Sequence, residues 1–236
     1  MDKIILGDAF EVLKTLPDKS VDLVMTDIPY LMSNAKAGKG YWQQFTQAVQ
    51  DELQDKEIAD GVDISWVDEC IRVLKRINMY IWMSKAQIPE YLNYFIAKGC
   101  SFEILVWIKP DAMPLHNCKY NSDKEYCLYF RKNGYCQPRD NYYARTYFMH
   151  NKNIEDKNLY GHPTCKPVGI TKILIENSTH EGDVVLDPFL GSGTTAVAAY
   201  QTKRHYIGIE KNEKFYNTAV TRIEEEKKHL DLPLTF

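Results

Sequence analysis

Two stretches of the chain carry residue types that could bind a ligand or act on it. The first, Asp27-Ile28-Pro29-Tyr30, directly follows an apolar run, 21–26, that we expect to be a strand. A carboxylate and a fixed backbone carbonyl can accept hydrogen bonds from an exocyclic amine, and a tyrosine ring can stack on the base that carries it. Pro29 stiffens the turn and biases Ile28 toward an extended backbone, which sets the direction of the Ile28 carbonyl. A strand-ending turn with a half-buried tyrosine is the alternative interpretation.

The second stretch, 184–196, reads Val-Val-Leu-Asp-Pro-Phe-Leu-Gly-Ser-Gly-Thr-Thr-Ala. Its apolar start predicts a buried strand, and Gly191 and Gly193 predict a tight turn that opens a helix of small residues. A second apolar run, 206–209, ends on Glu210, about 20 residues further on, as in a Rossmann unit that binds ribose hydroxyls with an acid. A P-loop is disfavoured, because the second glycine is followed by threonine and not by lysine.

Strands and helices alternate along most of the chain and must position these two stretches. The alternation predicts an α/β fold of the doubly wound, Rossmann-like kind, with a mainly parallel sheet and helices on both faces. Both stretches should then lie at the carboxyl edge of the sheet, where such folds bind ligands. We expect strands at 3–6, 21–26, 79–83, 102–108, 125–130, 184–186 and 206–209, and helices at 10–16, 64–74, 89–97, 167–175, 194–199 and 212–228. The strand at 125–130 is expected to form a hairpin with 102–108.

Composition limits the classes of function. The 236 residues suit one sizeable α/β domain, and the net charge of -3 means that a nucleic-acid partner would need a local basic patch. An early charge at the N-terminus and the lack of an apolar run near about 18 residues lead us to expect a cytoplasmic protein. The six cysteines form no C-x-x-C pair, so reduced thiols are expected; the alternative is a zinc site from Cys118, Cys127 and Cys136 with His116.

Three motifs in a fixed order resemble those of amino-group DNA methyltransferases. Asp27-Ile28-Pro29-Tyr30 resembles their D/N/S-P-P-Y/F/W catalytic motif, and 187–193 resembles their S-adenosylmethionine loop. The segment 162–167, His-Pro-Thr-Cys-Lys-Pro, resembles the H-P-T-x-K-P segment that precedes that loop. A catalytic motif first and a cofactor loop last is the order of the circularly permuted beta class.

The resemblance implies an S-adenosylmethionine-dependent methyltransferase fold over a single catalytic domain, 1–236. It covers nearly the whole chain except 31–63, which we expect to be a mobile loop or lid, and 110–160, the expected target-recognition region. It also implies that Asp27 and the Ile28 carbonyl hold the target amine while Tyr30 stacks on a flipped base, so that the expected catalytic residues are Asp27, Ile28, Pro29 and Tyr30. The expected cofactor-binding residues are Asp8, Ala9, Thr164, Lys166, Asp187, Pro188, Phe189, Gly191, Ser192, Gly193, Thr194 and Glu210.

For several of these positions the resemblance implies a specific contact with the cofactor, and a purely structural role is the alternative. The resemblance places Glu210 on the ribose hydroxyls, Asp8 on the adenine, and Thr164 and Lys166 near the methionine carboxylate. Glu210 could instead be a helix-start acid, Asp8 a turn residue and Lys166 a surface charge. One departure from the family pattern is Ile28, which stands where the first proline is usual, so the turn is expected to lose rigidity.

The resemblance implies direct methyl transfer from S-adenosylmethionine to the N6 amine of adenine, with no covalent intermediate and no metal. Adenine is favoured because an initial aspartate goes mainly with adenine in this family and serine with cytosine. The alternatives are an N4-cytosine enzyme, an RNA or protein-amide methyltransferase, and a catalytically silent DNA-binding module. The expected partners are DNA, a second copy of the chain and a cognate restriction endonuclease. DNA contacts are expected from Lys36, Lys39, Lys119, Arg131, Arg139 and Arg145, with tyrosines interleaved.

Overall fold

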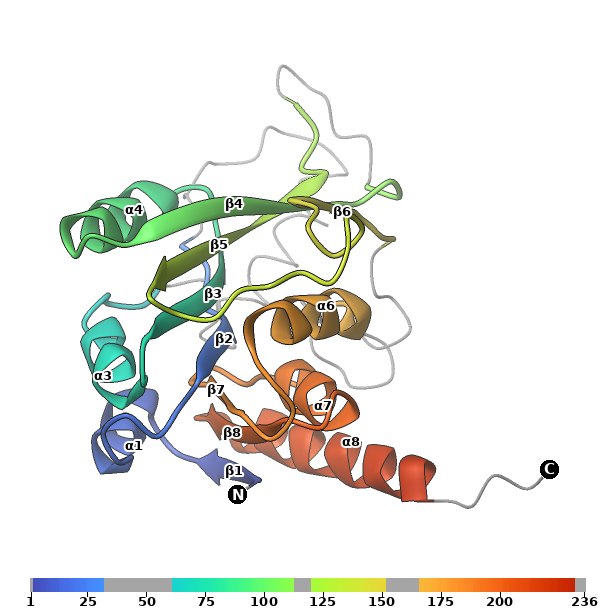
Figure 1. The fold of residues 1–236 in the computed structure, drawn as a ribbon. Coiled ribbons are helices and arrows are strands. Elements are labelled where there is room, and N and C mark those ends of the chain that lie inside the picture. The colour runs from blue at the N-terminus through green and yellow to red at the C-terminus, as the bar shows by residue number, and fades with distance from the viewer. Residues whose placement is uncertain (1, 32–60, 113–119, 152–165, 232–236) are drawn as a thin grey trace, which may run out of the picture.

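Apolar runs rich in valine, isoleucine and aromatic residues form the strands of one mixed sheet (Figure 1). The computed structural model describes residues 2–31, 61–112, 120–151 and 166–231. Within them the sheet has the strand order β1-β8-β7-β2-β3-β5-β4-β6, and all neighbours are parallel except β5, which is antiparallel to β3 and to β4. The strands are β1 (Lys3–Leu6), β2 (Leu23–Asp27), β3 (Ile77–Met83), β4 (Ser101–Ile108), β5 (Lys124–Lys132), β6 (Tyr147–Met149), β7 (Val184–Asp187) and β8 (His205–Glu210).

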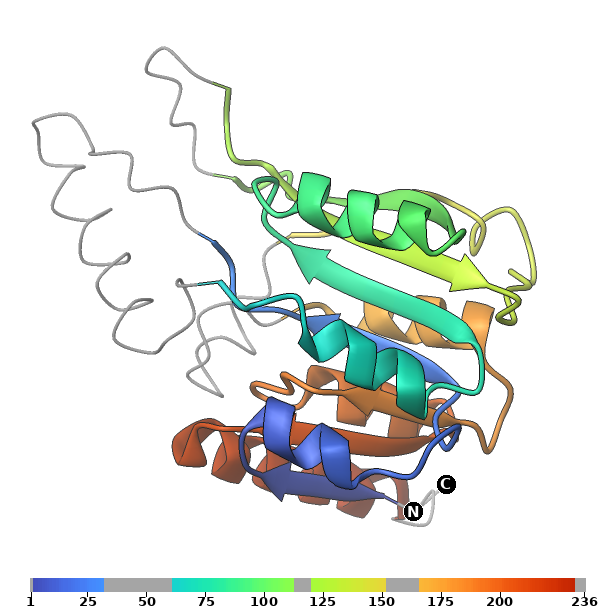
Figure 2. The ribbon, with the colours of Figure 1, turned by 90° about the vertical axis from the view of Figure 1, so that its left-hand side faces the viewer.

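Helices cover both faces of this sheet, and each face has its own hydrophobic core. On one face, nearest the viewer in Figure 2, lie α1 (Ala9–Thr15), α3 (Trp66–Val73) and α4 (Ile88–Ala97). On the other lie α6 (Val168–Ser178), α7 (Thr194–Gln201) and α8 (Glu213–Asp231). The predicted doubly wound α/β fold is confirmed.

Local signals fix where the helices near the carboxyl edge begin. The Asp8 side chain accepts a hydrogen bond from the backbone nitrogen of Phe10, at 2.9 Å, and caps α1. The Asn212 side chain caps α8 in the same way, since its Oδ1 lies 3.0 Å from the backbone nitrogen of Lys214. At the start of α7, Gly193 has a φ of +89°, which a glycine adopts without strain.

Most of the expected elements are present, with small shifts at their ends. The helix expected from 64 begins at Trp66, and β5 pairs with β4 in the expected hairpin. Two features were not expected: β5 also pairs with β3, and a short strand, β6, runs parallel to β4. Of the expected lid, residues 32–60 lie outside the described residues, as do 113–119 and 152–160 of the expected recognition region.

The structure also bears on the cysteines and on membrane insertion. Cys127 is buried and Cys136 partly buried, both as free thiols, while Cys118 and His116 lie outside the described residues. In the described part of the chain, no group of three or more His, Cys, Asp or Glu side chains could hold a metal ion. None of the helices described is both long and apolar enough to cross a membrane.

The close packing of α7 on α8 at Gly193 generates the first prediction. A Cβ at this position would lie 3.1 Å from the Cα of Ala219, whereas one at Gly182, which has a similar φ of +85°, would meet no described atom within 4 Å. We expect Gly182→Ala to lower the free energy of unfolding by about 1 kcal/mol through backbone strain alone. Gly193→Ala should cost about 1–3 kcal/mol more because of the added overpacking. Urea denaturation of both variants measures the difference, and equal losses would contradict it.

Candidate active site

Four acidic residues stand in a row along the carboxyl edge of the sheet. Asp27, Asp187 and Glu210 are the last residues of β2, β7 and β8, and Asp8 follows β1 by two residues. These strands are consecutive neighbours in the sheet, and Leu6 of β1 is paired with Glu210 of β8. Residues from the first and the last parts of the sequence thus meet at one edge, as the strand pattern predicted.

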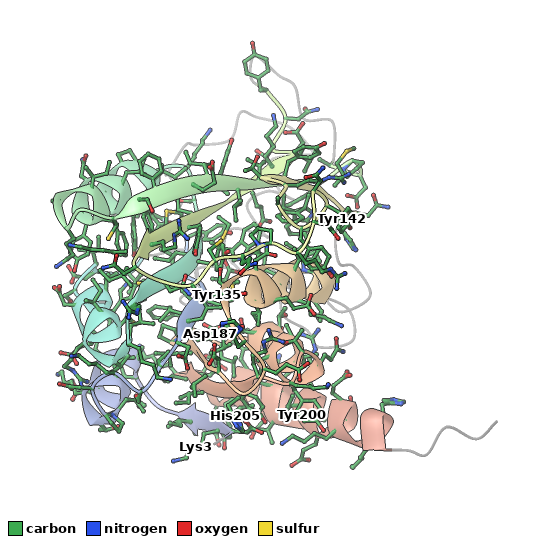
Figure 3. All side chains as sticks on the ribbon, viewed as in Figure 1. Lys3, Tyr135, Tyr142, Asp187, Tyr200 and His205 are labelled. Carbon is green, nitrogen blue, oxygen red and sulfur yellow. The ribbon has the colours of Figure 1, made fainter. Side chains whose placement is uncertain are left out.

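Asp187 is the buried link between the two motifs. Its Oδ1 accepts a hydrogen bond from the hydroxyl of Thr26, at 2.6 Å, and another from the backbone nitrogen of Phe189, at 3.0 Å. Burial raises the pKa of Asp187 to about 7, although these hydrogen bonds lower it. A cation beside this carboxyl would favour its ionised form and lower its pKa. Asp187 is labelled near the centre of Figure 3.

The glycine-rich loop is held against the end of β8. The backbone nitrogen of Gly191 donates to Oε2 of Glu210 at 2.7 Å, and that of Asn212 donates to Oε1 at 2.8 Å. Burial raises the pKa of Glu210, while these backbone hydrogen bonds oppose the rise. Leu190 is held in turn, because its backbone nitrogen donates to the carbonyl of Ile209 at 2.9 Å. These hydrogen bonds fix the position of the Glu210 carboxylate against the loop.

The other predicted residues of this loop face the protein interior. Ser192 and Thr194 are buried, and Nη1 of Arg222, on α8, lies 3.3 Å from the Ser192 carbonyl oxygen and 3.2 Å from the Thr194 hydroxyl. The Phe189 ring stands edge-on to Trp66 of α3, with the ring centroids 5.3 Å apart. Arg222 and Trp66 were not expected from the sequence; they hold the loop from opposite faces of the sheet.

The turn after β2 is held by hydrogen bonds and by packing. The backbone nitrogen of Ile28 donates to the carbonyl of Trp82 at 3.2 Å, and the Ile28 side chain is 2% exposed. The Gln87 side chain donates to the Pro29 carbonyl at 3.0 Å. The expected loss of rigidity at Ile28 is thus offset, because its N–H makes a hydrogen bond that the usual proline could not make.

The Asp27 carboxylate has one occupied and one unoccupied oxygen. Oδ2 accepts a hydrogen bond from the ammonium of Lys166, whereas Oδ1 is buried without a hydrogen-bond partner among the described residues. The side chain as a whole is 23% exposed, so it is accessible from one side. Burial raises the pKa of Asp27 to about 6, against the opposing effect of Lys166.

Lys166 belongs to a chain of alternating charges beside Asp27. Its Nζ lies 3.0 Å from Oε2 of Glu125, which also forms an ion pair with Lys109 and accepts a hydrogen bond from the Tyr30 hydroxyl at 3.2 Å. Burial alone would raise the pKa of Glu125, but the two lysines bring it down to about 2. The two carboxylates in turn raise the pKa of Lys166, although burial opposes them. Glu125 and Lys109 were not predicted as site residues.

The remaining predicted residues lie in different parts of the structure or outside the described residues. Ala9 is buried in the first turn of α1, and Pro188 lies in the loop after β7. Arg131 pairs with Asn78 and Ser101 at the amino ends of β3 and β4, so the structure does not bring it to the edge that holds Asp27. The guanidinium groups of Arg139 and Arg145 stack on the rings of Tyr143 and Tyr142, 3.7 and 4.7 Å from the ring centroids. Thr164, Lys36, Lys39 and Lys119 lie outside the described residues.

Comparison with known proteins identifies relatives over nearly the whole chain. The model of a DNA methylase family, N6_N4_Mtase, matches residues 21–221. The chain is 29% identical to the type II methyltransferase M2.MboI of Moraxella bovis, over 93% of this chain and 86% of that protein. It is also 29% identical to M2.DpnII of Streptococcus pneumoniae, over 96% and 92%, and to M.HinfI of Haemophilus influenzae, over 96% and 69%.

Solved structures show the same fold. The complex of M1.HpyAVI with SAM matches with a TM-score of 0.67 at 24% identity, over 94% of this chain and 100% of that one. PvuII DNA methyltransferase, described as cytosine-N4-specific, matches with a TM-score of 0.71 at 17% identity, over 100% and 88%.

The burial of Ile28 generates a prediction about the turn that carries Asp27. Removing its buried methyl groups in Ile28→Ala should lower the free energy of unfolding by about 2–4 kcal/mol, and Ile28→Val by about 0.5–1.5 kcal/mol. Ile96→Ala is the matched control, because Ile96 is 51% exposed and its loss should change stability by less than about 0.5 kcal/mol. Urea denaturation measures all three. If Ile28→Ala cost no more than the control, packing would not be what fixes this turn.

Proposed function

The chain belongs to the N6/N4 family of DNA methylases and methylates DNA with S-adenosylmethionine as its cofactor; from that premise we propose that its target is the N6 amine of adenine in a flipped base. The observation that carries the proposal is Oδ1 of Asp27, a buried acceptor without a partner among the described residues. A buried acceptor left unpaired costs about 1–3 kcal/mol, which a donating amine would recover. The initial aspartate of the motif favours adenine over cytosine.

The residues along the carboxyl edge fit the cofactor. S-adenosylmethionine carries a positive sulfonium, an ammonium and two ribose hydroxyls, and a row of carboxylates suits all of these groups. We assign Glu210 to the ribose hydroxyls, Asp8 to the adenine and Asp187 to the positively charged end, with Gly191 and Gly193 shaping the loop. The raised pKa of Asp187 supports this assignment, since a buried carboxyl gains most from a cation beside it.

Within this site the chain's own residues hold the base and accept a proton. Asp27 and the Ile28 carbonyl accept hydrogen bonds from the two N–H groups of the amine. These hydrogen bonds favour a tetrahedral nitrogen, whose lone pair is then free to react. Tyr30 stacks on the base. Bound S-adenosylmethionine supplies an electrophilic methyl group, and the electron pair of its S–C bond stays on sulfur. The amine nitrogen forms the new bond to carbon and loses one proton, which we assign to Asp27.

The wider context of the reaction is also part of the proposal. The catalytic motif follows β2 and the glycine loop follows β7, which is the chain order of the beta class. The relatives are named as type II methyltransferases, and by that likeness we propose that methylation by this protein, in the cytoplasm, protects a site from a cognate restriction endonuclease. A homodimer and a recognition region at 110–160 that includes Arg139 and Arg145 complete the proposal.

Nucleoside mass spectrometry of DNA from a methylation-free host that expresses the chain tests the reaction. We expect N6-methyladenine with the wild-type protein, none with Asp27→Ala, and an unchanged amount with Asp18→Ala, a control at an exposed ion pair. N4-methylcytosine would contradict the choice of base. Methylated ribonucleosides without methylated DNA would favour an RNA substrate, and a lack of any modified base from soluble protein would favour a silent binding module.

The raised pKa of Asp27 predicts how the rate depends on pH. The carboxylate must be ionised to accept the amine, and its protonated fraction grows as the pH falls through about 6. The second-order rate constant for methylation of DNA at saturating cofactor reports the enzyme before DNA binds. It should therefore fall by about tenfold per pH unit below that value and level off above it. A rate that stayed constant down to pH 5 would show that Asp27 does not act in this form.

A further inference from the structure

The Lys166 ammonium lies over the ring on which the target base has to stack. It donates to Oδ2 of Asp27, and its Nζ stands 5.2 Å from the centroid of the Tyr30 ring and 5.7 Å from that of Trp82. A base stacked on Tyr30, with its amine on the unoccupied Oδ1 of Asp27, would meet this ammonium. The ammonium thus stands above the aromatic ring while it contacts Oδ2, the other oxygen of the same carboxylate.

Glu125 is already in contact with the group that would have to move. Its Oε2 is 3.0 Å from the Lys166 Nζ, so the ammonium lies between the carboxylates of Glu125 and Asp27. The Lys109 ammonium and the Tyr30 hydroxyl also contact the Glu125 carboxylate and fix its position. The Lys166 and Glu125 side chains are only 6% and 15% exposed, so water can replace little of this pairing.

The cost of moving a buried charge decides what Glu125 can do. An ammonium taken from Asp27 without another partner would be an unpaired buried charge, which is strongly unfavourable. A small rotation toward Glu125 keeps the ammonium paired throughout. Glu125 is a second carboxylate that forms an ion pair with Lys166.

We propose that Glu125 is a positioning residue, which takes over the Lys166 ammonium from Asp27 when the target amine binds. Until a base arrives, Lys166 pairs with Oδ2 of Asp27 and stands over the Tyr30 ring. The inference rests on the proposed function, because it assumes that an amine binds at Asp27. It adds to that function a residue of β5 that touches neither base nor methyl group.

A double-mutant cycle of Glu125→Gln and Lys166→Met tests the exchange. In Glu125→Gln the ammonium keeps Asp27 as its charged partner, so the single-turnover rate at saturating DNA and cofactor should fall by at least about 30-fold. Adding Lys166→Met removes the trapped ammonium, and the double variant should be at least about fivefold faster than Glu125→Gln alone. Glu103→Gln, an exposed glutamate of the neighbouring β4, should keep the wild-type rate.

The outcomes separate this inference from the proposed function. A wild-type protein that methylates no base would overturn the proposed function itself. If the wild type is active, a Glu125→Gln rate equal to the wild-type rate overturns the inference. A double variant as slow as Glu125→Gln, or slower, also overturns it, since a merely structural glutamate predicts no recovery.

Two further measurements keep the test decisive. The dissociation constant of S-adenosylmethionine, measured by calorimetry for each variant, separates loss of cofactor binding at Lys166 from loss of rate. Should Glu125→Gln fail to fold by circular dichroism, Glu125→Asp takes its place, because it keeps the charge but withdraws it by one methylene. Its expected rate lies below the wild type, again with recovery when Lys166→Met is added.

Discussion

The pairing of β2 with β7 is the interaction on which the site depends. Leu23 and Val24 of β2 lie beside Val185 and Leu186 of β7, and the Thr26 hydroxyl donates to Asp187 at the end of the two strands. The residues joined by that buried hydrogen bond are 161 positions apart in the sequence. In the proposed function one motif binds the amine and the other binds the cofactor, and this pairing brings the two motifs together.

This junction also divides the sheet into two kinds of structure. On one side, β4 and β5 form a hairpin of neighbouring strands; on the other, β1 pairs with β8 and so joins the two ends of the chain. Bringing distant segments together costs more chain entropy than forming local contacts. The side of the sheet that contains β1 and β8 should therefore assemble more slowly than the β4–β5 hairpin. The carboxylates of the proposed cofactor site all depend on these long-range pairings, whereas Glu125 and Lys109 belong to the local hairpin.

The sequence allowed the strands to be predicted where their apolar runs were clear, and the motifs then located the edge at which they meet. The apolar runs that became β7 and β8 were clear in the sequence, and the expected hairpin of β4 and β5 is present. The contacts of Lys166 could not be predicted, because its partner Asp27 is 139 residues away. Glu125 was hidden for a different reason: it stands between Lys124 and Tyr126 after Asp123, and a short run of charges at a strand start usually points to solvent.

Other differences between the expectations from sequence and the structure also have physical causes. The strand β6 has three residues and depends on its pairing with Val106 to Ile108 of β4, so no sequence period marks it. The backbone nitrogen of Ile28 donates to the carbonyl of Trp82 on β3. The absence of proline at position 28 did not predict this hydrogen bond. Arg131 and the arginines at 139 and 145 looked alike in a basic segment, yet the sheet carries Arg131 to the edge opposite Asp27.

The charges around Asp27 can be understood from the needs of the reaction. Buried ion pairs add little to the free energy of unfolding, because the cost of desolvating the charges offsets most of their electrostatic attraction. In the proposed mechanism, the Lys166 ammonium lowers the pKa of Asp27 and so favours its ionised form while the amine is absent. When a neutral amine replaces the ammonium, the carboxylate loses part of the positive charge beside it and becomes more basic. Asp27 would then be a better proton acceptor at the moment when the amine nitrogen has a proton to lose.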